Sequence, residues 1–489
     1  MRANGTNQSE TFRKPLGLLN MTKEQMDKLH SAALEILAET GVKVCEEEAV
    51  ELLRKAGAQV SGDLVKIEAG LVDKAIKSAA GRILIADRSG APAMTLVKGN
   101  TYFGTGSATP YVIDINSGRR RIAVKEDAVK ATIITDALEN IDFVMSMAHA
   151  SDVPRERTDR HHFEAMLLHT TKPIIFDAYD REGFLDILEM AALAAGSMES
   201  LSGNPFIIHY AEPSSPLVHT KTALQKLLLA AEFKIPLVYA PAVMCGATGP
   251  VTTAGALAVA NAEILSGLVI HQLKTEGAPF IYGGGTPPMN MVTSICSYGD
   301  PQAFLGLASL VQMADYYELP SFTVAGATDA QIFDQQAAME AGFSLLFSAL
   351  AGGNLVHDLG YAGAGMATSL EYLVLCNEGV GIIRYLLAGL EINPTTLAMD
   401  VIRTVGPGGH FLAEDHTMAH FRRQMYFTKI FNRNTYENWL ASGGKSFDRS
   451  ANDLLKEILK WHEVPGLKLE TEKAIKDLAA GRSHRRELA

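Results

Sequence analysis

The sequence has few of the residues that mark metal-binding or disulfide-linked proteins. Only four of its 489 residues are cysteine, and Cys45, Cys245, Cys296 and Cys376 form no CxxC pair. This spacing offers no structural zinc site and suits a reducing compartment. The N-terminus has no signal-peptide core, and no apolar run approaches 18 residues without interruption. We therefore expect a cytoplasmic protein that does not associate with membranes.

Positive charge is also scarce. Lysine and arginine number 44 against 55 acidic residues, which gives a net charge of −11. We do not expect such a chain to bind nucleic acid through its overall charge. Hydrophobic residues, in contrast, make up 47% of the sequence. That share, over this length, predicts a large core and more than one domain.

One pattern recurs eight times between Thr101 and Leu390: a short apolar run, a turn and a helical stretch. The runs begin about 30 to 43 residues apart, which is about the length of one βα unit. Eight such units close a (β/α)8 TIM barrel, an α/β fold. The runs are Tyr102–Gly106, Phe143–Ala148, Pro173–Ala178, Pro205–Ala211, Pro236–Ala242, Pro279–Gly283, Pro320–Ala325 and Asn354–Leu359.

The barrel leaves a flanking segment on each side. Residues 1–100 predict a mostly helical N-terminal domain, residues 101–392 the barrel, and residues 393–489 a helical C-terminal cap. Tyr111–Val124 is typical of a β-hairpin with its turn at Ser117-Gly118. Asp300-Pro301 and Ser215-Pro216 each predict the start of a helix, with a cap followed by proline.

Polar and aromatic residues gather in the turns after the predicted strands, where barrel enzymes place their chemistry. Acids and rings together suit a cationic substrate, because both attract ammonium groups. Each such residue could equally cap the next helix or bond a neighbouring loop. The turns carry Thr105, Ser107, His149, Asp152, Asp177, Tyr179, Asp180, His209, Tyr210, Glu212, Met244, Cys245, Thr328, Asp329, Gln331, His357, Asp358 and Tyr361.

Three other chemistries are weighed at the same turns. No predicted strand ends in lysine, so Schiff-base catalysis lacks its nucleophile. The glycine-rich turns Gly104–Ser107 and Gly283–Gly285 could hold a phosphate, although tight packing explains them better. A metal-dependent lyase or hydrolase stays open, even though no HxH spacing is present. Its ligands would come from His209, Glu212, Asp329, His357 and Asp358.

Several stretches, in order along nearly the whole chain, resemble the trimethylamine methyltransferase family of corrinoid-dependent methyltransferases, in its branch without pyrrolysine. The resemblance begins at Ala38–Val42 and extends into the C-terminal segment. The matching stretches are Gly118–Ala123, Asp136–Asp142, Ala260–Gly267, Thr328–Ala330, Ala349–Asp358 and Val405–Gly409.

The resemblance implies transfer of a methyl group from an amine to Co(I) of a separate corrinoid protein. It implies no tightly bound cofactor and no resident metal, and we expect a homo-oligomer. Family members that use trimethylamine carry pyrrolysine just before the Ser/Thr-Asp-Ala motif, and Ala327 stands at that position here, beside Gly326. The expected substrate is therefore a quaternary amine of the betaine type. Glycine betaine, proline betaine, carnitine and γ-butyrobetaine are the candidates.

On this reading the turns hold a cage for a quaternary ammonium group. The expected rings are Tyr179, Tyr210, Tyr282, Tyr361 and Phe103, with Asp329 or Glu212 as the countercharge. His209, His357 or Gln331 would bond the carboxylate of a betaine. A third hypothesis is a betaine-binding protein that has the pocket but does not transfer the methyl group.

Overall fold

The computed structural model describes residues 17–18 and 20–482, so the outer ends of the predicted flanking domains lie outside the described residues. The N-terminal segment contains α1 (Lys23–Glu35), the π-helix η1 (Ile36–Thr40), α2 (Glu47–Lys55) and α3 (Ala69–Ser78). Thr22 caps α1, since its side chain accepts from the backbone N–H of Gln25. Strands β1 (Val42–Val44), β2 (Gln59–Ser61) and β3 (Leu64–Lys66) join the helices.

A hairpin that the sequence analysis did not predict follows. Strands β4 (Ile83–Ala86) and β5 (Pro92–Leu96) pair antiparallel. Alternate residues of this hairpin, Ile83, Ile85, Met94 and Leu96, are buried in one cluster with residues of the central sheet. The hairpin lies in the predicted N-terminal domain, but its apolar face belongs to the core of the sheet.

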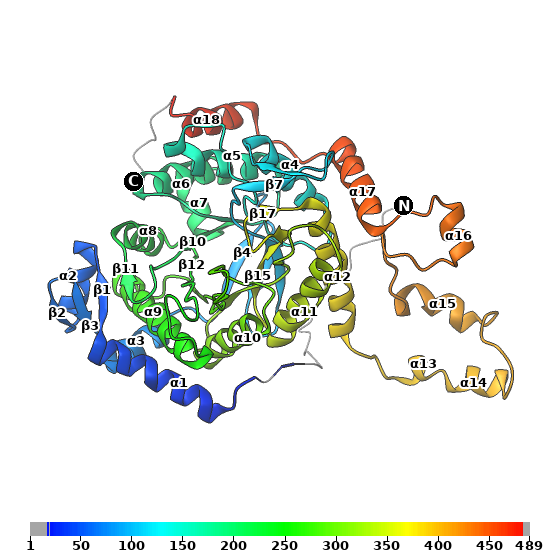
Figure 1. The fold of residues 1–489 in the computed structure, drawn as a ribbon, viewed down its shortest axis with the longest axis horizontal. Coiled ribbons are helices and arrows are strands. Elements are labelled where there is room, and N and C mark those ends of the chain that lie inside the picture. The colour runs from blue at the N-terminus through cyan, green and yellow to red at the C-terminus, as the bar shows by residue number, and fades with distance from the viewer. Residues whose placement is uncertain (1–16, 19, 483–489) are drawn as a thin grey trace.

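The centre of the molecule is a curled sheet of seven parallel strands (Figure 1). Seven of the eight predicted runs form these strands, and each strand pairs with its neighbour in parallel. The order across the sheet is β6-β15-β14-β13-β12-β10-β9. The strands are β6 (Tyr102–Thr105), β9 (Ile174–Phe176), β10 (Ile207–Ala211), β12 (Leu237–Tyr239), β13 (Phe280–Gly283), β14 (Ser321–Val324) and β15 (Leu355–Leu359).

The second predicted run, Phe143–Ala148, does not form a named strand. It makes isolated parallel bridges, from Phe143 to Gly104 of β6 and from Val144 to Ile174 of β9. The backbone N–H of Ile175 donates to the Val144 carbonyl at 2.9 Å. The Phe143 ring explains Gly104, because a Cβ on Gly104 would lie 2.2 Å from that ring.

Helices cover the outer surface of the sheet. Along each strand, alternate residues face the interior cluster of the sheet or the helices. Ile208, Val238, Ile281 and Leu355 face inward, and Ile207, Leu237 and Phe280 face outward. The helices are α4 (Lys125–Ala137), α5 (Thr158–His169), α6 (Arg181–Ala195), α7 (Met198–Gly203), α8 (Lys221–Glu232), α9 (Thr253–Lys274), α10 (Pro301–Tyr316), α11 (Gln335–Ala351) and α12 (Leu370–Ala388).

The local predictions on hairpin and helix starts have mixed outcomes. The hairpin is confirmed as β7 (Tyr111–Ile113) and β8 (Arg120–Ile122), extended by β16 (Tyr361–Ala362) and β17 (Ala367–Thr368). The start of α10 is confirmed too, with Asp300 as its cap. The predicted helix start at Ser215-Pro216 is wrong. The chain first makes the short strand β11 (Val218–His219), and α8 begins at Lys221 with Thr220 as its cap.

Helix α9 is long and apolar enough to cross a membrane, but 78% of its most apolar window is buried inside the protein. It is therefore a core helix, and Asn261, Glu263, Ser266 and His271 interrupt its apolar sequence.

The C-terminal segment divides into two parts. Helices α13 (Pro394–Leu397), α14 (Met399–Val405), α15 (Asp415–Gln424) and α16 (Tyr436–Ala441) project away from the sheet and its helices (Figure 1). Helix α17 (Phe447–Trp461) packs on α12 and α4, and α18 (Leu469–Ala479) packs on α5 and α6. Only this second part resembles the predicted cap.

Candidate active site at the carboxyl ends of the strands

A cavity of about 100 Å³ opens beyond the carboxyl ends of the strands, and we call it the mouth cavity. Its floor is the next inward-facing layer above Ile208, Val238 and Leu355, because side chains two residues apart on a strand face the same way. The cavity is lined by Tyr210, Glu212, Ala240, Pro241, Ala242, Gly284, Gly285, Pro287, Tyr298, Ala303, Leu307, Phe322, Val324, His357 and Asp358.

Aromatic rings form one wall of the mouth cavity. The rings of Phe322 on β14 and His357 on β15 are stacked, with centroids 4.0 Å apart. The Tyr210 ring on β10 lies 5.5 Å from Phe322 and 6.2 Å from His357. These three strands therefore bring three rings together at one side of the cavity, two of them stacked and the third tilted against them.

Two carboxylates lie against the rings. Tyr210 donates its hydroxyl to Glu212, which follows β10. Glu212 is open to solvent through the mouth, yet the surrounding protein raises its pKa by desolvation, with Asp358 and Asp177 adding to the rise. Burial, followed by the nearby Glu212, raises the pKa of Tyr210 well above its usual value. The phenol therefore stays neutral and the site as a whole is acidic.

Asp358 adopts an unusual backbone conformation at the end of β15. Its φ is +73°, a left-handed value that non-glycine residues seldom adopt. Its Oδ1 lies 2.7 Å from His357 Nδ1, although no described group is aligned to hydrogen-bond that nitrogen. A Cβ on Gly106 would lie 2.4 Å from the same Oδ1. Close packing against Gly106 and His357 therefore holds the Asp358 carboxylate in the lining of the mouth cavity.

Tyr298 enters the mouth cavity from the loop between β13 and α10. Asp329 holds this loop, since its carboxylate accepts from the backbone N–H of Tyr298 at 2.8 Å and of Gly299 at 3.1 Å. It also accepts from the Ser297 hydroxyl. Burial, then Asp358, raises the pKa of Tyr298 well above its usual value. Asp329 therefore positions a cavity residue and does not line the cavity.

Tyr361 and Asp177 lie near the mouth cavity without lining it. The Tyr361 hydroxyl is 3.2 Å from Ser107 Oγ, and burial followed by Asp358 raises its pKa well above its usual value. Burial also raises the pKa of Asp177 at the end of β9. Lys226 of α8 reaches the Ala178 carbonyl beside it. Burial lowers the pKa of Lys226, against the opposing effect of Asp177.

Two of the predicted cage rings, and one predicted partner of the carboxylate, face the helices instead of the cavity. Phe103 is buried in the cluster with α4 and α12. The His209 ring packs against Phe176 and Phe184, and its Nδ1 lies 3.2 Å from the Phe176 carbonyl. Burial lowers the pKa of His209 well below its usual value. Tyr282 donates to Asn261 of α9 at 2.9 Å.

The remaining predicted residues divide between the cavity and its surroundings. Tyr210, Glu212 and His357 line the cavity. Tyr179 is partly exposed after β9, and its backbone N–H donates to buried Asp159. Gln331 is exposed and donates to the Asp329 carbonyl at 3.4 Å. Ala327 is buried and forms a bridge with Tyr361.

The sequence analysis missed two cavity rings, and it missed Lys226. Phe322 lies inside a predicted strand, so a search of the turns passed over it. Tyr298 lies 15 residues beyond the end of β13. Lys226 belongs to a helix, and the search for a strand-end lysine did not include it. Alternation along β14 could have indicated Phe322, whereas no local signal brings the distant loop of Tyr298 to the cavity.

The predicted metal ligands are not gathered in one place. Within residues 17–18 and 20–482, no group of three or more His, Cys, Asp or Glu side chains is arranged to hold a metal ion. Glu212, His357 and Asp358 line the mouth cavity, whereas His209 faces the helices and Asp329 binds a loop. The five predicted ligands therefore do not come together as one donor set.

Comparison with known proteins gives an independent result. The model of the trimethylamine methyltransferase (MTTB) family matches residues 2–486. A trimethylamine methyltransferase of Desulfitobacterium hafniense is 32% identical over 451 residues, which cover 91% of this chain and 90% of the relative. A glycine betaine methyltransferase of the same species, strain Y51, is 28% identical over 464 residues, which cover 94% of this chain and 96% of the relative.

A solved structure shares the fold. The hydroxylamine complex of MtmB, a monomethylamine methyltransferase known from Methanosarcina barkeri, superposes with a TM-score of 0.51 at 14% sequence identity. The superposition covers 90% of this chain and 88% of the MtmB chain. At this level of identity the likeness concerns the fold alone.

Proposed function

Because this chain belongs to the trimethylamine methyltransferase (MTTB) family, we propose that it takes a methyl group from a quaternary amine and passes it to Co(I) of a cognate corrinoid protein. The observation that carries the proposal is the composition of the mouth cavity. Its rings are Tyr210, Tyr298 and Phe322, and its carboxylates are Glu212 and Asp358. Neutral rings and carboxylates around a small cavity attract an ammonium group that has no N–H to donate.

The proposed reaction needs no proton from the protein. The Co(I) electron pair attacks the methyl carbon, the C–N bond breaks, and its electron pair stays on nitrogen. A quaternary nitrogen thus leaves as a neutral tertiary amine. The task of this chain is to hold the cation and direct one methyl group out of the mouth, which is catalysis by orientation and electrostatics. The neutral phenols of Tyr210 and Tyr298 suit this task.

The substrate that we propose is of the betaine type, such as glycine betaine, proline betaine, carnitine or γ-butyrobetaine. The position that matches pyrrolysine is occupied by the small residue Ala327. This chain therefore lacks the side chain that family members using trimethylamine carry there. Among the three predicted partners of a carboxylate, only His357 lines the cavity. We propose that His357 donates to the substrate carboxylate while Glu212 and the rings receive the ammonium group.

We also propose that the curled sheet works as a closed (β/α)8 barrel, with the segment at Phe143–Val144 as its shortest strand. The support is a set of hydrogen bonds on both sides of the segment. The backbone N–H of Asp142 donates to the Phe103 carbonyl at 2.6 Å, and that of Val144 donates to the Pro173 carbonyl at 2.9 Å. A closed barrel would give the corrinoid protein a single entrance to the amine.

The remaining parts of the proposal rest on the family resemblance and on the composition and pattern of the sequence. The corrinoid belongs to a separate partner protein, and this chain holds no cofactor or metal of its own. We propose a cytoplasmic homo-oligomer with no role on nucleic acid or membranes. Residues 101–392 would form the catalytic barrel between the flanking domains 1–100 and 393–489.

The test is a methyl-transfer assay. The purified chain is mixed with Co(I) corrinoid, free or on its carrier protein, and with trimethylamine or one betaine at a time. Formation of the methyl–cobalt bond is followed by visible absorbance. We expect turnover with at least one betaine and none with trimethylamine. Turnover with trimethylamine alone would reverse the choice of substrate, and binding without turnover would support a betaine-binding protein. Activity that depends on added zinc or magnesium would support the metal-dependent lyase or hydrolase.

A further inference from the structure

The segment 384–450, all of which the structure describes, contains no buried residue. We call this segment the arm. It carries the short helices α13 to α16, and Figure 1 shows it leaving α12, extending away from the sheet and returning to α17. Helices of four to ten residues are unstable in water unless they pack on another surface. Residues 424–434 of the arm pack against α12 of the same chain. The short helices α13 to α16 still need a further surface.

The arm exposes several large apolar side chains among its charged ones. Leu390 is 91% exposed, Leu412 81% and Met418 67%. Ile392, Ile402 and Phe427 are exposed as well. Contiguous exposed apolar groups on a folded protein usually mark an interaction surface.

A second uncovered surface lies on α11. The only charged residue of this helix is Glu340, which turns toward the sheet and accepts from Thr328 Oγ1 at 2.5 Å and from the backbone N–H of Asp329 at 2.9 Å. The opposite side exposes Ala338, Met339, Gly342 and Phe343, and we call these four residues the α11 face. A Cβ on Gly342 would meet no described atom within 4 Å, so a partner can approach this backbone closely.

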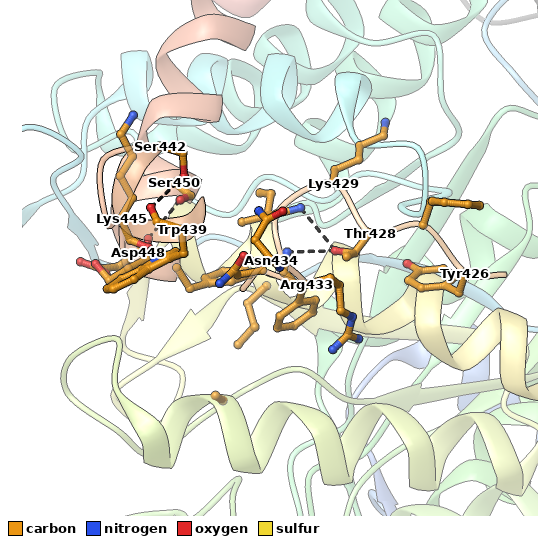
Figure 2. Close-up of a pocket in the computed structure, with 18 of the residues that line it drawn as sticks. Tyr426, Thr428, Lys429, Arg433, Asn434, Trp439, Ser442, Lys445, Asp448 and Ser450 are labelled. Carbon is orange, nitrogen blue, oxygen red and sulfur yellow. Dashed lines mark hydrogen bonds between the residues drawn. The ribbon is translucent and has the colours of Figure 1, made fainter. Parts of the chain in front are cut away.

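The arm and the α11 face border one groove. A cavity of about 1250 Å³ lies between the start of α11, α12 and the arm. Outside the arm it is lined by Phe333, Asp334, Gln335, Ala338 and Leu375, and from the arm by Tyr385, residues 424–434, Trp439, Ser442, Lys445, Ser446, Phe447, Asp448 and Ser450. Figure 2 shows Tyr426, Arg433 and Trp439 along the arm side of this groove, with a helix running below them. The arm of the same chain forms one wall but leaves Met339 and Phe343 uncovered.

We propose that a second copy of this chain covers both surfaces, so that the arm of each protomer lies on the α11 face of the other. Two unpartnered apolar surfaces of one chain suit a two-fold dimer, in which every contact occurs twice. A stable interface uses about 20 to 30 residues from each partner, and the arm, residues 384–450, is longer than that. The uncharged α11 face suits the exposed apolar side chains of the arm, such as Leu390 and Leu412. This assembly does not depend on which amine the enzyme uses.

Sedimentation velocity and light scattering of the full chain test the proposal. We expect a mass of about twice the 52.7 kDa of one chain, or an even multiple of it. Phe343→Asp on the α11 face and Leu412→Asp on the arm should each shift the protein toward monomer. Leu469→Asp on α18 is the matched control, since Leu469 is 81% exposed and should leave the mass unchanged. All three positions are exposed, so circular dichroism should show unaltered folding.

A mixing experiment separates arm-on-face contact from other arrangements. Phe343→Asp keeps a native arm and Leu412→Asp keeps a native α11 face, so one intact contact should re-form when the two variants are combined. We expect heterodimers from the mixture at concentrations where each variant alone is monomeric. A monomeric wild-type chain would overturn the proposal, as would dimers that both substitutions leave intact, or a mixture that does not associate. Association of the arm only with an added corrinoid protein would also overturn it.

Discussion

The two surfaces of the central sheet carry the same kinds of residue, but these residues have different contacts on each surface. On β10, His209 faces outward against Phe176 and Phe184, whereas its neighbour Tyr210 faces the mouth cavity and donates to Glu212. On β13, Tyr282 faces outward and donates to Asn261. The outward residues complete the packing between sheet and helices, and the inward residues remain available to a ligand. Residue type alone therefore does not identify the site, because the side of the strand decides.

Two glutamates extend the comparison. The pKa of Glu212 at the mouth and the pKa of Glu263 on α9 are both raised, first of all by burial. Glu263 has its hydrogen bonds satisfied by Ser215 Oγ at 2.8 Å and by the backbone N–H of Leu217 at 2.6 Å. The only hydrogen bond described for the Glu212 carboxylate comes from the hydroxyl of Tyr210, a cavity residue. We infer that Glu263 supports the fold, whereas Glu212 is available to bind a cation.

The largest effect on activity is expected from Glu212→Gln. The substitution keeps the size of the side chain but removes the charge that would face the ammonium group. Losing one member of a charge pair in a partly desolvated site costs about 2 kcal/mol, which is roughly a 30-fold fall in kcat/KM for methyl transfer. The thermal midpoint should stay nearly constant. Glu199→Gln, at an exposed position on α7, is the control.

An unchanged kcat/KM in Glu212→Gln would refute the assignment of this carboxylate as the countercharge. Asp358→Asn would then be the next variant to measure, because Asp358 is the other acid of the mouth cavity.

Glu263→Gln should change the pH dependence of stability. Burial raises the pKa of Glu263 to about 7, whereas an unfolded glutamate titrates near 4.3. The folded chain therefore keeps a proton that the unfolded chain releases. The retained proton therefore contributes its full stabilisation below the unfolded pKa. That contribution to the free energy of unfolding is lost as pH rises through about 7. Glutamine can accept from Leu217 and donate to Ser215. Between about pH 5 and pH 8, the free energy of unfolding of the wild type should fall with rising pH. We expect that of the variant to fall by less, with a difference on the order of 2 kcal/mol.

Urea unfolding at several pH values measures this difference, and methyl transfer should be unaffected because Glu263 lies on the outer helix layer. Parallel stability curves for the wild type and the variant would show that Glu263 is ionised in the folded chain across this range.

A matched pair of tyrosine variants tests the inward–outward comparison directly. Tyr210→Leu removes a ring from the mouth cavity and should weaken binding of a quaternary amine by about 0.5 to 2 kcal/mol. Tyr282→Phe leaves Oδ1 of the buried Asn261 side chain without its donor and should lower the free energy of unfolding by about 1 to 3 kcal/mol. Calorimetric titration and urea unfolding of both variants give the comparison. Weaker amine binding in Tyr282→Phe would contradict the assignment by strand side.

The sequence was informative about the sheet and much less about the site. Seven of the eight apolar runs form strands of the sheet, because each buried strand is short, apolar and bounded by turns. The same apolarity conceals which residues face inward, since helices cover the outer surface and both sides of a strand such as β13 are buried. The sequence therefore predicts Phe103, His209 and Tyr282 as site residues alongside Tyr210 and His357. The hairpin β4–β5 and the loop of Tyr298 depend on contacts between distant segments, which a local pattern does not contain.

The smallest effect is expected from Asp329→Asn, and it decides between two roles of this carboxylate. The sequence suggested a countercharge for the substrate, whereas the structure has Asp329 accepting from Tyr298, Gly299 and Ser297. Asparagine keeps one acceptor oxygen and loses the charge. If Asp329 only holds the loop, one hydrogen bond is lost, which costs about 0.5 to 1.5 kcal/mol locally. We expect kcat/KM to fall by roughly two- to threefold, about 0.5 kcal/mol, and the loop 286–299 to be cleaved faster by protease. A loss of activity as large as that of Glu212→Gln would show that Asp329 supplies charge to the substrate after all.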